Sequence, residues 1–329
     1  MTVGYPTGQL LAALLVVVGA STAAVGCAQT PSNPVDSAQS LESSSASRIN
    51  TAGWSDSPFI SRDGKRLYFM YSRWDFSPFI HSGGSAQPVV RGPDRPGLHK
   101  NGSPWDESDI YVSVKNADGS WGVPVNLGLN GPFGDASGME IDGGNTFIWL
   151  RGDGATNNIV MASRNPDGSW GAITDLGPGI NAAGAIQDNP YISADGNAIW
   201  FVSNRPGGVG AKDLWFSSKT AGVWSSPVNV GAPFNSAGDD DQPWISPVSN
   251  DVYWNGPSGI MHCVSNGSTC TGVPDVVVIP GCDFAAEVSM PDDRQTMFFG
   301  CGTFATGRVK IMYSSRQANG SWGTAVPVD

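Results

Sequence analysis

The chain has 329 residues, enough for one large domain or two ordinary ones, and its 43 glycines and 24 prolines favour many turns over long helices. Its net charge of −11 leaves no basic face for phosphate groups, which excludes nucleic acid as an expected partner. Hydrophobic residues make up 40% of the chain, and this excludes disorder over most of the length.

The first 26 residues carry no charged side chain, and their apolar run from Leu10 to Val18 is too short to span a bilayer. We interpret residues 1–26 as a signal peptide. The Ala-Val-Gly-Cys sequence that ends at Cys27 resembles the bacterial lipobox, which would make Cys27 the lipidated first residue of the mature protein. The alternative is that Cys27 is lost in a conventional cleavage.

Residues 27–50 are rich in serine, contain two prolines and lack aromatic side chains. This composition cannot bury a core and predicts a flexible tether. We therefore expect an exported protein, either a membrane-anchored lipoprotein or periplasmic or extracellular. Contact with a membrane is expected only through a lipid on Cys27.

A turn that ends in tryptophan recurs along the chain, at Trp121, Trp170, Trp224 and Trp322. The spacings are 49, 54 and 98 residues, and the last is two periods of 49. A second marker, a proline followed by an aromatic residue, isoleucine and serine, precedes these turns, and looser copies begin near Glu140 and Glu287. The chain is therefore built from internal repeats.

Each repeat contains four short β-rich runs, which in the third repeat are residues 190–193, 198–203, 213–218 and 224–230. Four strands in each unit of about 50 residues are typical of a β-propeller. The sequence predicts an all-β fold, a single five-bladed β-propeller of four-stranded antiparallel blades over residues 51–329, which we expect to be a monomer. The pattern gives no sign of an exchanged strand closing the ring.

The repeat that spans residues 203–215 and 224–231 resembles the TolB-like propeller repeat, in the version found ahead of OmpA-like peptidoglycan-binding domains in envelope proteins. The resemblance covers nearly all of residues 54–329 and implies a propeller. It departs from the family pattern because no OmpA-like domain follows and because five blades replace the six of TolB. A shared repeat does not imply a shared function.

Four further cysteines are compatible with an oxidising compartment. Cys263 and Cys270 flank an Asn-Gly turn, and Cys282 and Cys301 lie at the two ends of another predicted hairpin. Of the three possible connectivities, these two pairings are favoured. Zinc binding with the nearby His262 is the alternative, which the lack of a Cys-x-x-Cys motif disfavours.

Acidic residues recur where the innermost strands of the blades are expected to open on one face. Asp56, Asp188 and Asp241 each precede a marker proline by two residues, while Glu140 and Glu287 lie near the proline position itself. Carboxylates around one mouth could act as acid and base, or could attract a cation. The alternative is that these residues cap turns.

Calcium is the one cofactor that the sequence leaves possible, since Asp239, Asp240 and Asp241 are consecutive. The chain has no Asp-x-Asp-x-Asp-Gly loop, so a solvated turn is favoured at these residues. No other cofactor and no metal site are expected.

Arginines follow the second strand of three repeats, at Arg73, Arg151 and Arg205. On the same rim they could hold a ligand's carboxylate, although pairing with a neighbouring aspartate is favoured. The first repeat also carries a loop of about 35 residues, a length that is usually functional or disordered. We expect it to cover the mouth without supplying a catalytic residue; its candidate ligand-binding residues are Trp74, His81, His99 and Trp105.

Two functions remain open from the sequence. The first is a non-catalytic propeller of the cell envelope that binds a protein or a glycan at its acidic mouth. The alternative is a glycoside hydrolase that resembles the five-bladed arabinanases and xylosidases in architecture and acid placement. There Asp56 would be the base, Glu140 or Glu287 the acid, and Asp188 the group that tunes the pKa of the acid. Whether the protein is an enzyme stays open.

Overall fold

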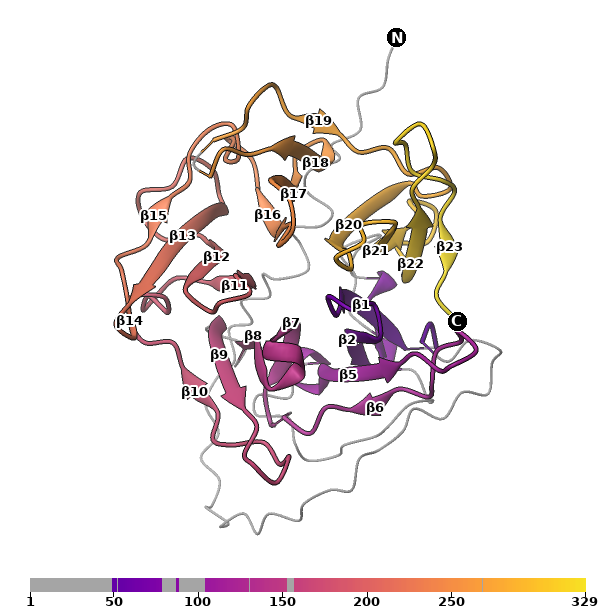
Figure 1. The fold of residues 1–329 in the computed structure, drawn as a ribbon, viewed down its shortest axis with the longest axis horizontal. Coiled ribbons are helices and arrows are strands. Elements are labelled where there is room, and N and C mark those ends of the chain that lie inside the picture. Colours follow the sequence, from indigo (N-terminus) through magenta and orange to yellow (C-terminus); the bar gives the residue numbers. More distant parts are fainter. Residues whose placement is uncertain are drawn as a thin grey trace.

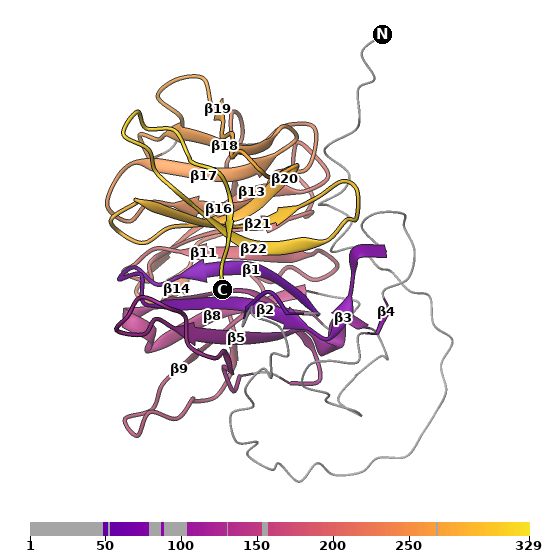
Figure 2. The same ribbon diagram turned by 90° about the vertical axis from the view of Figure 1, so that its right-hand side faces the viewer.

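The computed structural model describes residues 49–51, 53–78, 87–88, 104–129, 131–152, 157–267 and 269–329. Five antiparallel sheets stand around a central axis like the blades of a propeller (Figure 1). Viewed from the side, β1 of the first blade lies against β22 of the last, so the ring is closed (Figure 2). The predicted fold is confirmed. The predicted signal peptide, Cys27 and most of the tether lie outside the described residues.

The strands follow the chain from the inside of each blade to its outer edge. In the first two blades they are β1 (Trp54–Ile60), β2 (Arg66–Ser72), β5 (Asp109–Val114), β6 (Val125–Asn126), β7 (Gly134–Ile141), β8 (Thr146–Gly152), β9 (Asn157–Ser163) and β10 (Thr174–Asp175). In the third and fourth blades they are β11 (Gln187–Ile192), β12 (Ala198–Ser203), β13 (Asp213–Thr220), β14 (Val223–Trp224), β15 (Val228–Asn229), β16 (Asp241–Ile245), β17 (Asp251–Gly256), β18 (Gly259–Val264) and β19 (Asp275–Val276).

The fifth blade consists of β20 (Phe284–Ser289), β21 (Thr296–Gly302), β22 (Val309–Ser315) and β23 (Val326–Pro327). The remaining elements are the small hairpin β3 (Trp74–Asp75) and β4 (Gln87–Pro88) and the 3₁₀ turns η2 (Pro104–Glu107) and η3 (Asp142–Gly144). In the third blade the predicted outer strand is divided, because both β14 and β15 pair with β13.

Every innermost strand contains a β-bulge at the same place. In β1, for example, the chain takes three steps from Asp56 to Phe59, whereas the paired strand β2 takes only two, from Met70 to Tyr68. The residue after each aspartate position then adopts a positive φ, between 42° and 60°, which is strained for a side chain other than glycine. The marker proline follows directly in three blades and holds the chain at the bulge.

The recurring tryptophan turns lie at the outside of the blades and have a structural role. In the Asp-Gly-Ser-Trp turn of the first blade, Asp118 accepts hydrogen bonds from the backbone N–H and hydroxyl of Ser120. The tryptophan pairs across the turn with a basic residue whose charge lies over the indole ring, 5.4 Å away for Lys115 and Trp121 and 3.9 Å for Arg164 and Trp170. The repeated sequence thus stabilises hairpins far from the channel.

An asparagine in the linker after the second blade and another after the third bind back to the third strand of the blade just completed. Asn181 donates to the carbonyl of Ile159 at 2.9 Å and accepts from its N–H at 2.8 Å. Asn235 makes the same two bonds with Leu214, at 2.9 and 2.8 Å. Each asparagine satisfies the backbone N–H and adds a second hydrogen bond to the carbonyl, which also accepts from the N–H of Leu176 or Val230 just beyond the outer strand.

On the last blade this place is taken by Asn50, from the opposite end of the chain. Its amide donates to the carbonyls of Ile311 and Val328 at 2.8 and 3.0 Å and accepts from the N–H of Ile311 at 2.8 Å. The preceding Ile49 is fully buried. The start of the described chain therefore binds the last blade as a linker would, and this latch helps to close the ring.

None of the helical turns in the described ranges is long and apolar enough to cross a membrane.

Candidate functional site: the central channel

Five side chains, one from each blade, point toward the axis at the bulge positions. They are Ser57, Ser137, Asn189, Gln242 and Glu287, here called the bulge ring. The cavity that they help to line has a volume of about 60 Å³. This is room for a few water molecules, far below the ~300 Å³ of the smallest ordinary ligand pockets.

Glu287 of the bulge ring is hydrogen-bonded to Asp56 of the neighbouring blade. Both carboxyl groups also accept from the backbone N–H of Ser57, at 2.8 and 2.9 Å. Glu287 further accepts from the hydroxyl of Ser57 and from the amide of Gln242, both at 2.9 Å. Burial first, and then the charge of Asp56, raise the pKa of Glu287 well above its usual range, and two carboxyl groups that are hydrogen-bonded to each other need a proton between them.

A second acidic pair lies between the third and fourth blades and is closed by a lysine. The ammonium group of Lys212 is 4.0 Å from Asp188 and 3.6 Å from Asp241. Burial raises the pKa of Asp188 to about 7, with Asp241 adding to the effect against the opposing charge of Lys212. Burial alone would lower the pKa of Lys212, but the two carboxylates outweigh it and raise that pKa.

The remaining predicted acid, Glu140, lies away from the bulge ring. It sits three residues beyond the bulge residue Ser137 of β7, where the other strands carry residues such as Ile60 and Ile192. Arg66 holds it with two hydrogen bonds of 2.7 and 2.8 Å, and Tyr68 donates a third at 2.6 Å. The expectation that Glu140 and Glu287 occupy equivalent places is therefore wrong.

A larger cavity of about 240 Å³ opens on the face of the turns between first and second strands, such as Asp63-Gly64, and we call it the hairpin-face cavity. Its charged rim includes Arg62, Asp63 and Asp142, and Glu140 with Arg66 forms part of the wall. From the sequence, the ligand was expected at the opposite, acidic mouth, because the recurring acidic residues were the main signal for a binding site.

Four side chains, Phe59, Met139, Tyr191 and Trp244, line both this cavity and the narrow one at the bulge ring. Each follows its bulge by two residues, so four blades contribute to one collar around the axis. The rings of Tyr191 and Trp244 meet edge to face, with centroids 6.5 Å apart. The collar thus lies between the larger cavity and the acidic end of the channel.

The three predicted rim arginines have structural partners. Arg73 pairs with Glu107 and Arg151 with Asp135, the latter at 2.7 Å. Arg205 has no acidic partner among the residues that the structure describes, contrary to expectation. It donates to the carbonyls of Gly179 and Ile180, and burial lowers its pKa to about 10.

The described part of the long loop packs on the first blade. Trp105 stacks on Phe76 with the ring centroids 4.2 Å apart, and the guanidinium of Arg73 lies 5.3 Å from the ring of Trp74. His81 and His99 lie outside the described residues. Their part in ligand binding, and that of the two tryptophans, stays a prediction.

The run Asp239 to Asp241 is not the solvated turn that the sequence favours, because Asp240 and Asp241 are buried. Asp240 accepts a hydrogen bond from the N–H of Ser236, and burial raises its pKa to about 6. The described residues contain no group of three or more His, Cys, Asp or Glu side chains placed to hold a metal ion. Calcium stays only a possibility.

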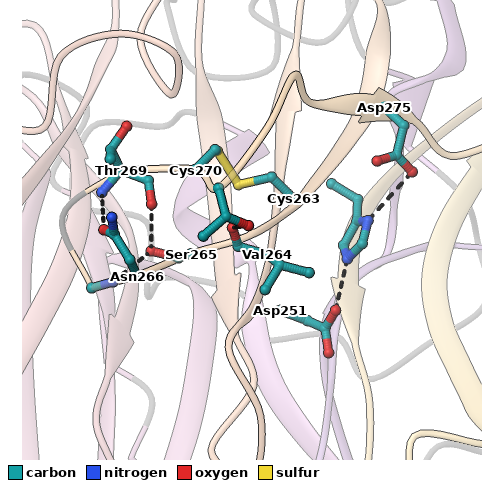
Figure 3. Close-up of a disulfide and its surroundings, with 11 residues drawn as sticks. Asp251, Cys263, Val264, Ser265, Asn266, Thr269, Cys270 and Asp275 are labelled. Atoms are coloured by element: carbon teal, nitrogen blue, oxygen red, sulfur yellow. Dashed lines mark hydrogen bonds and ion pairs between the residues drawn. A yellow bond between two sulfur atoms is a disulfide. The ribbon is translucent and has the colours of Figure 1, made fainter.

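Both predicted disulfides are present. Cys263–Cys270 closes the hairpin after β18 and Cys282–Cys301 ties β20 to β21 (Figure 3 shows the first). Both ring nitrogens of His262 contact aspartates, so they are not placed to bind zinc together with the cysteines. It lies between Asp251 and Asp275, 2.8 and 3.3 Å away. Disulfides are typical of exported proteins.

No family model matches the chain, and no curated protein matches it in sequence. Solved structures that resemble it include TolB from Acinetobacter baumannii, with a TM-score of 0.45 and 11% identity over 82% of this chain and 67% of that one. A thermostable family-43 glycoside hydrolase has a TM-score of 0.48 and 11% identity, covering 85% and 96%. The α-L-arabinofuranosidase Arb93A from Fusarium graminearum has 0.47 and 12%, covering 88% and 85%. Likenesses this distant do not bear on the activity of this chain.

From the sequence, Asp56 and Glu287 were expected close together as a possible base and acid, whereas the pairing of Asp188 with Asp241 and the lysine between them were not predicted. Lys212 sits in the loop ahead of β13, inside the stretch that resembles the TolB repeat, and nothing in its spacing marks it as buried. The bulge ring had a visible signal, since its members directly precede the marker prolines in three repeats.

Proposed function

We propose that this protein is an exported, non-catalytic β-propeller that binds a protein ligand through the hairpin-face cavity. The observation that carries the proposal is the cavity of about 240 Å³ with an apolar wall from four blades and a charged rim. Apolar walls with a few placed polar groups are the usual make-up of a binding pocket.

A protein is favoured over a glycan because the collar presents little of its aromatic faces. Trp244 is 3% exposed and Tyr191 is 8% exposed, so neither offers an open ring for a sugar to stack on. A side chain that inserts end-on needs no such face. Glu140 and Arg66, the polar groups of the wall, already pair with each other. They would therefore help to orient a bound side chain more than they would strengthen its binding.

Export is supported by the two disulfides, which persist in oxidising compartments. We further propose that the signal peptide and the lipid on Cys27 place the propeller at the cell envelope, tethered through residues 27–50, where its partner would be an envelope protein. The net charge of −11 disfavours nucleic acid as a partner.

A glycoside hydrolase is the second candidate, favoured by one observation: the raised pKa of Glu287 beside Asp56 suits a general acid. Against it, the two carboxyl groups are hydrogen-bonded to each other, whereas glycosidase pairs stand roughly 5–5.5 Å or 6.5–9.5 Å apart. The cavity beside them, at about 60 Å³, also leaves no room for a sugar ring.

The test of the first proposal fills the cavity. Ala194 is exposed at its rim, and Ala194→Trp should cover the opening without disturbing the core. We expect this variant to lose, by at least tenfold, the envelope protein that the wild type retains from detergent extracts. The matched control is Ala172→Trp, an exposed alanine on the outer side of the second blade, which should retain it.

Equal retention by both variants would contradict the proposal. The hydrolase is tested by sugar release from plant and bacterial polysaccharides. Release that is lost in Asp56→Asn or Glu287→Gln, with the fold intact, would favour the enzyme instead.

A further inference from the structure

The inner end of the channel carries a negative charge without a positive partner. Among the described residues, the groups that contact Asp56 and Glu287 are the indole N–H of Trp54 and the polar groups of Ser57 and Gln242, all of them neutral. A shared proton removes one charge of the pair and leaves the other.

In the described innermost strands, the other buried carboxylates each have a basic side chain beside them. Asp135 has Arg151 at 2.7 Å, Glu140 has Arg66 at 2.7 Å, and Asp188 and Asp241 share Lys212. Burying a charge without a counter-charge is costly, so a cation at the Asp56–Glu287 pair would stabilise the channel. Glu287 is the member that faces the cavity, as it is part of the cavity lining.

The collar lies between that charge and the open cavity. Phe59, Tyr191 and Trp244 place aromatic rings around the axis, and Met139 completes the wall. A methylene chain packs well against apolar and aromatic side chains. A long side chain that enters from the hairpin face would therefore meet the collar first and the anionic pair last.

We propose that the group bound in this channel is a lysine side chain of the partner protein, with its stem inside the collar and its ammonium group at Asp56 and Glu287. This rests on the proposed function and names the chemistry of its ligand. A lysine ammonium group has three donors and no acceptor, and the bulge ring offers carboxyl, amide and hydroxyl oxygens as acceptors. A basic partner would also be attracted over distance by the net charge of −11.

The experiment compares two short peptides on the full-length protein by calorimetry and NMR titration. One contains a single lysine and the other is identical except that the lysine is acetylated, which keeps the stem and removes the charge. We expect the lysine peptide to bind at least tenfold more tightly. Glucosamine, an ammonium group without the stem, should bind no better than the acetylated peptide.

The variants test the place of the charge. Asp56→Asn combined with Glu287→Gln keeps an oxygen for the N–H of Ser57 and removes both charges, so the preference for lysine should fall at least tenfold. Asp167→Asn, the matched control, removes an exposed acid from an outer turn of the second blade and should change affinity less than threefold. Unfolding midpoints confirm that each variant is folded.

Proton release supplies a second readout that a structural role would not produce. Because the ammonium group displaces the shared proton, the affinity of the wild type should rise with pH, whereas Glu287→Gln alone should bind with a flat pH profile. Lysine and acetyllysine peptides that bind equally, or glucosamine that binds as well as lysine, would overturn the inference. Since Ala194→Trp tests the cavity separately, retention lost in that variant would leave the proposed function standing.

Discussion

Lys212 is 4% exposed and its ammonium group makes no hydrogen bond to the described residues, although two carboxylates flank it. Oδ2 of Asp188, 4.0 Å away, is buried and unsatisfied as well. A cluster of this kind contributes less to stability than its charges suggest, because desolvation offsets much of the attraction. Protonation of Asp188 in this cluster should therefore change the free energy of unfolding of the protein.

Stability should fall as pH rises from about 4 to about 7 because of Asp188. Its pKa is raised from 3.8 to about 7, so in this window the folded state holds a proton that the unfolded chain has lost. Asp188→Asn removes this contribution, and its unfolding midpoint in urea should depend less on pH than that of the wild type. An unchanged slope between pH 4 and 7 would show that Asp188 is ionised in the folded protein.

For single residues, the sequence was a better guide to which acidic residues belong to the candidate site than to the role of each. Glu287 was found because it interrupts the repeat, and the structure places it against Asp56. Glu140 interrupts the repeat equally, but one-residue differences around a β-bulge decide which side chain faces the axis. Periodicity alone does not locate such a bulge.

Among the elements, the asparagine linkers hold neighbouring blades together by satisfying backbone groups on the third strands. Asn181→Ala would leave the buried N–H of Ile159 without its partner, and would leave the carbonyl of Ile159 with only the longer bond from the N–H of Leu176. We expect a loss of about 2–4 kcal/mol in the free energy of unfolding, measured with urea.

The control for this prediction is Asn165→Ala. Asn165 donates to Ser169 in an exposed turn, so its loss should cost less than about 0.5 kcal/mol. Similar losses in the two variants would mean that the linker bonds do not carry the stability assigned to them.

The hairpins were predictable where a short turn fixes them. Asp-Gly and Asn-Gly dipeptides mark the turns, and the tryptophan repeat marks the outer edge of each blade. The linker asparagines were not recognised, because an Ile-Asn or Phe-Asn dipeptide has no meaning until a strand is placed beside it.

For the molecule as a whole, five blades follow from counting repeats, while closure of the ring also involves two residues ahead of the first strand. Ile49 and Asn50 were assigned to the tether by composition, and both contact the last blade. Composition averages over a window and does not separate two packed residues from the serines beside them.

A protein that begins at Gly53 should therefore be less stable than one that begins at Arg48. Burial of Ile49 is worth about 1.5–3 kcal/mol, and each lost bond of Asn50 about 1 kcal/mol. We expect at least ~3 kcal/mol in the free energy of unfolding, and faster hydrogen exchange at Ile311 and Val328. Exchange that stays as slow as in the longer chain would argue that the ring closes without the latch.

The latch also sets where mechanical load enters the molecule. Asn50 binds Ile311 and Val328 at the seam between the last blade and the first, and the chain ahead of it leads toward Cys27. Tension on a tether anchored at that cysteine would pull on this seam before any other. Asp56 and Glu287 span the same seam, so the latch and the acidic pair both join the first blade to the last.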